Sequence, residues 1–105
     1  TAESVQICRR ALGSERAVIA SGGIRHGMDV AVALALGADV AALAKPLLEA
    51  ADESEEAALR VLQTLIHELR VIAFCCGARN LEELRRVRAI APGAPFLLSE
   101  GEVVR

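Results

Sequence analysis

One stretch of sequence decides the fold of this chain: A-V-I-A-S-G-G-I-R-H-G, residues 17–27. Its first four residues are apolar and lie between turn-forming residues, which is typical of a strand buried on both faces. A glycine-containing loop follows, and a short helix is predicted over Met28–Leu36 before Gly37 stops it. A second apolar strand is predicted over Asp39–Ala44. This order indicates an α/β fold in which two parallel strands are joined by a right-handed helical crossover.

The loop over residues 21–27 is a candidate phosphate site. Gly22 and Gly23 have no Cβ, so a phosphate can approach their backbone N–H groups. Arg25 adds a permanently charged fork of donors, and Lys45 follows the second predicted strand. Because neighbouring parallel strands lie about 5 Å apart, both cations could reach one phosphate. For the glycine pair alone, a tight turn without a ligand is the alternative; the cation after the next strand favours the phosphate site. Consecutive loops at the C-terminal face of a (β/α)8 barrel hold a phosphate in this way.

Three titratable residues are candidates for a catalytic role. His26 is more typical of a half-exposed loop residue than of a ligand, and its role stays open. Asp29 is interpreted as a first-turn residue favoured by the helix dipole rather than as an acid catalyst. His67, in the middle of a long predicted helix, is interpreted as a surface residue. No Ser-His-Asp, Cys-His or paired-carboxylate arrangement stands out, so the catalytic residues stay unassigned.

Four more helical segments are predicted along the chain. They span Ala2–Leu12, Leu47–Ala51, Glu55–Cys76 and Leu81–Ile90. Asp52 with Glu55, and Asn80 with Glu83, have the spacing of capping boxes that start the last two of these helices. The longest helix has apolar residues at spacings of three and four, which predicts one continuous apolar stripe along it.

The composition indicates part of a larger α/β domain. The chain has 105 residues, of which 53% are hydrophobic, and it contains neither Trp nor Tyr. Two strands that are apolar on both faces cannot cover one another, so the rest of the sheet is expected outside this sequence. A net charge of −2 argues against a nucleic-acid or other polyanionic partner. No apolar run reaches membrane-spanning length, so no membrane partner is expected.

The cysteines, Cys8, Cys75 and Cys76, lack the spacing of a metal site. Neighbouring residues on a helix point about 100° apart, which disfavours a Cys75–Cys76 disulfide. All three are expected to be reduced, buried thiols in a cytoplasmic protein. No metal ligand is predicted within the chain.

The segment that contains the glycine loop resembles the end of an FMN-dependent (β/α)8 barrel. It reads I-A-S-G-G-I-R-H-G-M-D-V-A-V-A-L-A-L-G-A-D-V-A-A-L-A-K-P over residues 19–46. The 2-hydroxyacid oxidases typically carry D-G-G-x-R-x-G and later G-R-P, whereas the type 2 isopentenyl-diphosphate isomerases typically carry A-S-G-G-x-R and A-x-P. This chain has Ser21 where the oxidases usually have Asp, and A-K-P at residues 44–46 where they have G-R-P. Its segment G-A-R-N-L-E-E-L, residues 77–84, also resembles the isomerases, so all three features favour that family.

The resemblance implies a place for this chain in the barrel. Residues 1–98 would be the C-terminal part of an FMN-binding TIM barrel, strands 7 and 8 with their flanking helices, and residues 99–105 a C-terminal tail. The residues implied to hold the FMN phosphate are Gly22, Gly23, Ile24 and Arg25 after strand 7, and Ala44 and Lys45 after strand 8. Lysine in place of the commoner arginine keeps the charge but loses the bidentate geometry.

The isomerase family converts isopentenyl diphosphate to dimethylallyl diphosphate with reduced FMN and Mg²⁺, and NADPH serves as the flavin reductant. By this resemblance, the full-length protein is expected to be a cytoplasmic homo-oligomer acting on a small diphosphate. The family's catalytic, metal and substrate residues lie in earlier strands, upstream of Thr1. Two alternatives stay open: a 2-hydroxyacid oxidase of the same fold, and a non-catalytic phosphate-binding half-barrel. Alone, the chain is expected to be inactive and to aggregate or dimerise through open sheet edges.

Overall fold

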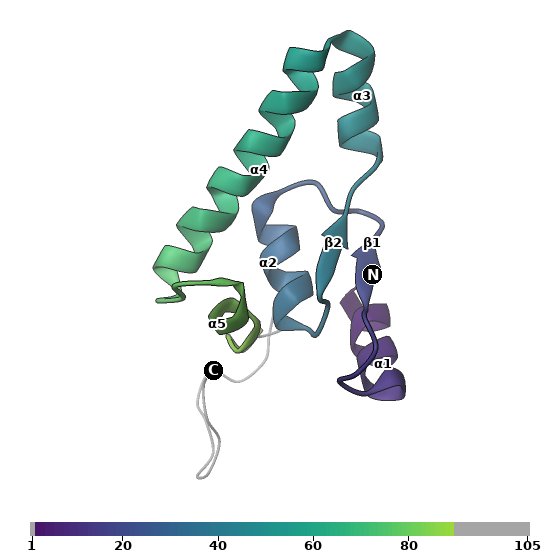
Figure 1. Cartoon of the computed structure of the whole chain (residues 1–105), viewed down its shortest axis with the longest axis vertical. Coiled ribbons are helices and arrows are strands. Elements are labelled where there is room, and N and C mark those ends of the chain that lie inside the picture. The colour runs from purple at the N-terminus through teal and green to yellow at the C-terminus, as the bar shows by residue number, and fades with distance from the viewer. Residues whose placement is uncertain (1, 90–105) are drawn as a thin grey trace.

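The computed structural model describes residues 2–89, which form five helices and two strands (Figure 1). In chain order the elements are α1 (Ala2–Leu12), β1 (Ile19–Ser21), α2 (Gly27–Ala35), β2 (Val40–Ala42), α3 (Lys45–Glu53), α4 (Glu55–Cys75) and α5 (Leu81–Arg85). The predicted helix end at Ile90, the domain boundary after residue 98 and the tail over residues 99–105 lie outside the described residues.

The two strands are parallel, as predicted, and α2 is the crossover between them (Figure 1). Ile19 pairs with Val40, and Ser21 pairs with Ala42. Both strands are shorter than predicted. The Val18 N–H donates to the Asp39 carboxylate at 2.9 Å, so regular pairing begins only after these two residues.

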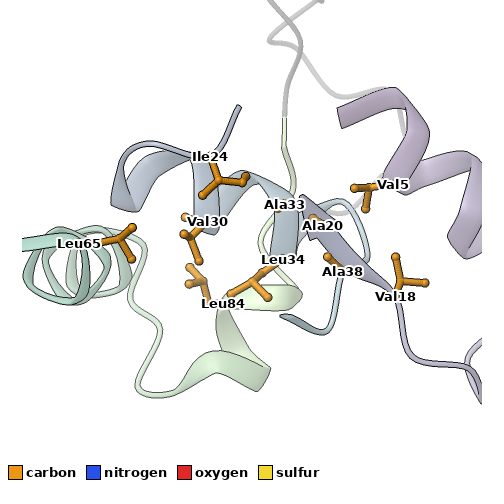
Figure 2. Close-up of a cluster of buried hydrophobic side chains, with 11 residues drawn as sticks. Val5, Val18, Ala20, Ile24, Val30, Ala33, Leu34, Ala38, Leu65 and Leu84 are labelled. Atoms are coloured by element: carbon orange, nitrogen blue, oxygen red, sulfur yellow. The ribbon is translucent and has the colours of Figure 1, made fainter. Parts of the chain in front are cut away.

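Only one face of the strand pair is covered by described residues. Val18 and Ala20 lie in a buried cluster with residues of α2, α4 and α5, as Figure 2 shows. On the opposite face, the paired residues Ile19 and Val40 are 63% and 53% exposed. The prediction that both faces are apolar is therefore matched by an uncovered apolar face, which further strands and side chains would bury.

The helices α3 and α4 form a hairpin that extends past the carboxyl ends of the strands (Figure 1). The predicted segment Leu47–Ala51 is longer than expected, because the helix already begins at Lys45 with Pro46 in its first turn. The predicted capping role of Asp52 is wrong, since Asp52 lies within α3. Ser54 is the N-cap of α4, and its hydroxyl accepts the Ala57 N–H at 3.0 Å.

A glycine lets α4 approach the start of α2. An ideal Cβ on Gly27 would lie 2.5 Å from the Glu68 Cβ and 2.7 Å from the Leu69 backbone nitrogen. No side chain fits in that space without moving one of the two helices. Leu65 of α4 is 9% exposed, whereas Leu62 and Ile66, which also belong to the predicted apolar stripe, are 37% and 47% exposed. The predicted apolar stripe is therefore only partly covered.

The helix α5 is shorter than the predicted Leu81–Ile90. Its start agrees with the sequence, because the Asn80 side chain accepts the Glu83 N–H at 2.9 Å. The Glu83 carboxylate accepts the Arg79 N–H instead of closing the capping box at Asn80. At its end, Arg86 and Val87 make i to i−3 bonds, which tighten the last turn and end the helix. Leu84 of this short helix is 1% exposed in the core.

At the amino ends of the strands, the side chain of Arg9 ties separate segments together. Its guanidinium donates to the backbone carbonyls of Gly13, Arg16 and Gly37 and to the Asp39 carboxylate. Arg85 of α5 adds a bond to the Asp39 carbonyl at 2.7 Å. The hydrogen bond from Val18 and then the bond from Arg9 hold the pKa of the Asp39 carboxyl below its usual value. We call this group of residues, Arg9, Asp39 and Arg85, the amino-edge network.

The prediction of buried cysteines is wrong for the described residues. Cys8, Cys75 and Cys76 are all free and all exposed. Cys8 lies on the outer side of α1, and Cys75 and Cys76 lie at the end of α4, next to Phe74, which is 85% exposed. Of the helices within residues 2–89, none is long and apolar enough to span a membrane.

Candidate functional site

The glycine loop leaves β1 in a conformation that other residues rarely adopt. Gly22 has φ +95° and Gly23 has φ +78°, both in the left-handed region. An ideal Cβ on Gly23 would find no protein atom within 4 Å. The space beside Gly23 is therefore open, and a side chain there would fill it. Ile24, the next residue, is 6% exposed and anchors the loop in the core (Figure 2).

The loop ends in a clamp formed by Asp29. Its Oδ2 accepts the backbone N–H of Arg25 at 2.9 Å and that of His26 at 3.0 Å. Asp29 is therefore a first-turn residue, as predicted, and it satisfies two N–H groups that would otherwise point out of the helix start. Among residues 2–89, the N–H groups of Gly23 and Ile24 donate to no protein acceptor. These two remain available to a ligand.

The two predicted cations lie at the same edge of the strand pair. The register pairs Ser21 with Ala42, so the segments that follow, with Arg25 and Lys45, both lie at the carboxyl ends of the strands (Figure 1). Arg25 is exposed, and its guanidinium makes no ion pair within the described part of the chain. A guanidinium without an ion pair can donate charge-assisted hydrogen bonds to the oxygens of a phosphate.

Lys45 is placed differently from the prediction, because it is the first residue of α3 rather than a loop residue. Ala44 is the N-cap of that helix. The Lys45 Nζ lies 3.9 Å from Glu49 Oε1, and both side chains are largely exposed. Lys45 therefore shares its charge with a carboxylate one turn along, whereas Arg25 does not. The assignment of Gly22, Gly23, Ile24, Arg25, Ala44 and Lys45 to a phosphate stays a prediction.

Two hollows adjoin the glycine loop. One, of about 290 Å³, is lined by Gly22, Gly23, Ile24 and Asp29 together with apolar residues of α1 and α2. The other, of about 490 Å³, lies between the loop and the α3–α4 hairpin. Its lining includes His26 and the charged residues Arg25, Glu53, Arg60 and Glu68. Because that lining carries both signs, the second hollow has no clear preference for an anion.

Other polar chemistry is sparse in the described residues. Within residues 2–89, no three His, Cys, Asp or Glu side chains come together as a metal site. His26 and His67 are both exposed, the latter as predicted for a surface residue. The Arg79 hydrogen bonds hold the pKa of the Glu83 carboxyl below its usual value, but they belong to the start of α5, not to the loop. The geometry thus supports anion binding and assigns no acid or base.

A phosphate group fits the loop on these observations. The open space at Gly23 gives access to the backbone, and the donors at Gly23, Ile24 and Arg25 suit an anion. The chain matches the family of FMN-dependent dehydrogenases over residues 1–91. It belongs to that family.

The relatives that it resembles within this range are isomerases by name. The chain is 52% identical over 91 residues to an isopentenyl-diphosphate delta-isomerase of Mycobacterium marinum, covering 87% of this chain and 26% of the relative. It is 47% identical over 92 residues to the enzyme of that name from a Synechococcus species, covering 88% and 26%. For the Deinococcus radiodurans enzyme, the identity is 49% over 85 residues, covering 81% and 25%. The chain thus spans about a quarter of the length of these relatives, and the resemblance to the isomerases is confirmed.

Two residues matter more in the structure than the sequence suggested. Gly27 reads as the last residue of a loop, but it is the contact between α2 and α4. Asp29 reads as a residue that complements the helix dipole, but its carboxylate also binds the loop backbone. The spacing of Asp29, three residues after the N-cap His26, is a local signal of such a bond. The Gly27 contact has no local signal, because its partner lies about forty residues further along the chain.

Proposed function

We propose that this chain is the C-terminal part of an FMN-binding (β/α)8 barrel, with β1 and β2 as strands 7 and 8 of that barrel. The full-length protein would be an isopentenyl-diphosphate isomerase that depends on FMN. The observation that carries the proposal is the identity of about half of the residues to isomerases across most of this chain. The uncovered face at Ile19 and Val40 supports it, because such a face needs the rest of a barrel.

The role proposed for this stretch is to hold the FMN phosphate. Gly23 and Ile24 would donate their backbone N–H groups, and the Arg25 guanidinium would add charge-assisted bonds. Gly22 provides the turn that brings them to the carboxyl edge, and Ala44 and Lys45 would close the site from the second loop. Reduced FMN in such an enzyme supports proton addition and removal at the allylic carbons of the substrate. These residues would fix where the flavin lies relative to that substrate.

The remaining parts of the reaction would come from residues outside this chain. As the resemblance to the isomerases implies, the metal and the substrate diphosphate would be held by residues of earlier strands. NADPH is proposed as the reductant of the flavin, and the assembly as a cytoplasmic homo-oligomer.

The full-length protein is purified, its cofactor is released, and the mass of the cofactor is determined by mass spectrometry. FMN is expected, because the loop offers donors for one terminal phosphate and lacks the G-x-G-x-x-G of a dinucleotide site. The protein is then supplied with isopentenyl diphosphate, Mg²⁺ and NADPH in the absence of oxygen, and dimethylallyl diphosphate is the expected product. Release of FAD, or no turnover by a flavin-loaded protein, would contradict the proposal.

A second candidate is a 2-hydroxyacid oxidase, which the name of the matching family favours. The same preparation, incubated with small 2-hydroxyacids in the absence of oxygen, would then bleach its flavin, because two electrons pass from the hydroxyacid to FMN as the 2-oxo acid forms. Ser21 and the A-K-P segment at residues 44–46 argue against this activity. The two assays on one preparation distinguish the candidates.

A further inference from the structure

The glycine loop runs between two fixed ends. Ser21 is held in the strand pair, and α2 begins at Gly27. Between them, Gly22 and Gly23 have no side chain to restrict their backbone, and their positive φ values are only two of many available to glycine. A loop of this kind loses binding affinity if it must be ordered when the ligand arrives. Something in the protein must therefore fix its path.

Contacts of Ile24 and Asp29 help to fix that path in the described part of the chain. The Ile24 side chain is buried in the core, and the Asp29 carboxylate binds the backbone N–H groups of Arg25 and His26. The Asp29 bonds determine how the chain leaves the glycine pair and enters the helix. They therefore determine where the Gly23 and Ile24 amides point and from where the Arg25 side chain starts.

Asp29 places a negative charge beside the proposed phosphate site. A carboxylate beside a phosphate site is unfavourable by Coulomb's law, and Asp29 lines the same hollow as Gly22, Gly23 and Ile24. The repulsion between the Asp29 carboxylate and a phosphate has to be offset by favourable interactions. The two hydrogen bonds from Asp29 to the loop backbone are such interactions. Those bonds also occupy the N–H groups of Arg25 and His26, so an anion is left with the donors ahead of them.

We propose that Asp29 is a positioning residue for the phosphate loop, an inference that rests on the proposed FMN site. It preorganises the Gly23 and Ile24 amides and the Arg25 side chain without touching the cofactor. Its effect is therefore specific to ligands that carry the phosphate. FMN and riboflavin share the ring system and differ in that phosphate, so comparison of the two isolates the loop.

The test uses the full-length protein stripped of cofactor and titrated with FMN and with riboflavin. Asp29→Ala should weaken FMN binding about tenfold, the factor that corresponds to ordering roughly one backbone residue, and leave riboflavin binding unchanged. Asp29→Asn should stay within about threefold of the wild type for FMN, because its amide oxygen can accept the same two N–H groups. Glu56→Ala is the matched control, since it removes a first-turn carboxylate of α4, a helix that starts at the outer end of the α3–α4 hairpin (Figure 1), and it should change neither affinity.

Several outcomes overturn the inference. Unchanged or tighter FMN binding in Asp29→Ala would mean that charge repulsion, not positioning, dominates. An equal loss for FMN and riboflavin would indicate a general loss of structure. A loss in Asp29→Asn as large as in Asp29→Ala would assign the effect to the charge. If Asp29→Ala does not fold, Asp29→Glu is used, because it keeps the charge and displaces the hydrogen-bond acceptor. The ratio of the affinity for FMN to the affinity for riboflavin should then fall. An unchanged affinity ratio overturns the inference.

Arg25→Ala is the reference that separates this inference from the proposed function. If Arg25→Ala weakens FMN binding and Asp29→Ala does not, the phosphate site stands and the role of Asp29 is wrong. If neither variant alters the ratio of the affinities for FMN and riboflavin, the phosphate binds elsewhere and both proposals fail.

Discussion

The two ends of the strand pair treat their polar groups in opposite ways. At the amino ends, the Arg9 guanidinium bonds four acceptors, and Asp39 accepts from both Arg9 and Val18. At the carboxyl ends, Arg25 has no ion pair within residues 2–89, and the space at Gly23 is open. One edge uses its hydrogen bonds to hold elements together, and the other leaves donors for a ligand. In (β/α)8 barrels, the two faces divide stability and function in a similar way.

A pair of glycine substitutions should show the largest difference between the two edges. Gly13 and Gly23 have similar φ values, +71° and +78°, and open space at the Cβ position. Valine at either should lower the free energy of unfolding by roughly 1–3 kcal/mol, because positive φ strains a branched residue. Only Gly23→Val should also weaken FMN binding, by at least about a hundredfold, since its side chain would occupy the place of the phosphate. Flavin-to-protein absorbance ratios and thermal melts of the two full-length variants check this.

The expected pattern fails in two ways. A Gly23→Val protein with normal flavin content would show that the backbone at Gly23 does not bind the phosphate. Loss of flavin in Gly13→Val as well would show that backbone strain alone, at either edge, releases the cofactor.

The amino edge is tested by Arg9→Ala. The Arg9 side chain is 22% exposed and bonds several segments at once, so its removal should lower the free energy of unfolding by roughly 2–4 kcal/mol. The FMN affinity of the folded protein should change by less than about threefold. Urea unfolding and FMN titration measure the two effects, and Arg10→Ala, an exposed neighbour on α1, serves as the control. If Arg9→Ala unfolds no more easily than Arg10→Ala, the amino-edge network does not hold the fold together.

The carboxyl edge gives the reverse expectation for Arg25→Ala. Loss of charge-assisted bonds to the phosphate should weaken FMN binding about ten- to a hundredfold, with little change in the melting temperature of the cofactor-free protein. Arg60→Ala is the control, because Arg60 is exposed and lines the neighbouring hollow; it should change FMN affinity by less than about twofold. Equal effects of the two substitutions would reduce the role of Arg25 to general positive charge.

The smallest effect is expected at Lys45. Its charge is shared with Glu49 at 3.9 Å and is largely exposed to solvent, so Lys45→Ala should weaken FMN binding only about two- to fivefold. Glu49→Gln should strengthen binding slightly by freeing the lysine. A loss at Lys45 as large as that at Arg25 would mean that the two loops contribute equally, and that the lysine turns toward the ligand when the cofactor is bound.

Much of the fold could be predicted from local sequence. Turn signals on both sides of two short apolar runs predicted the strands and the crossover helix, and the structure has them in that order. Gly22 and Gly23 were predicted to form the loop from their residue type alone, and their positive φ values agree. Local patterns succeed here because the strands, turns and helix starts depend on neighbouring residues.

The predictions from local sequence are wrong where distant residues, or two competing N-cap residues, determine the structure. Ser54 and Asp52 both suit an N-cap, and only the length of α3 decides for Ser54. The sequence predicts Lys45 in a loop because Pro46 indicates a break in the chain, whereas proline is compatible with the first turn of a helix, and α3 begins at Lys45. The exposure of the cysteines and the end of α5 depend on which other elements cover them. No local pattern contains that information.

The contact at Gly27 has a consequence for how substitution data on this protein should be read. A side chain there would push α4 away from the start of α2, and α3, which packs on α4, follows directly from the second strand. Both loops at the carboxyl edge would therefore shift together. A screen that scores only flavin retention would rank Gly27 beside the residues that bind the cofactor, although it lies between two helices. Hits in such a screen identify residues that shape the site as well as residues that touch the ligand, and binding measurements on single variants are needed to separate them.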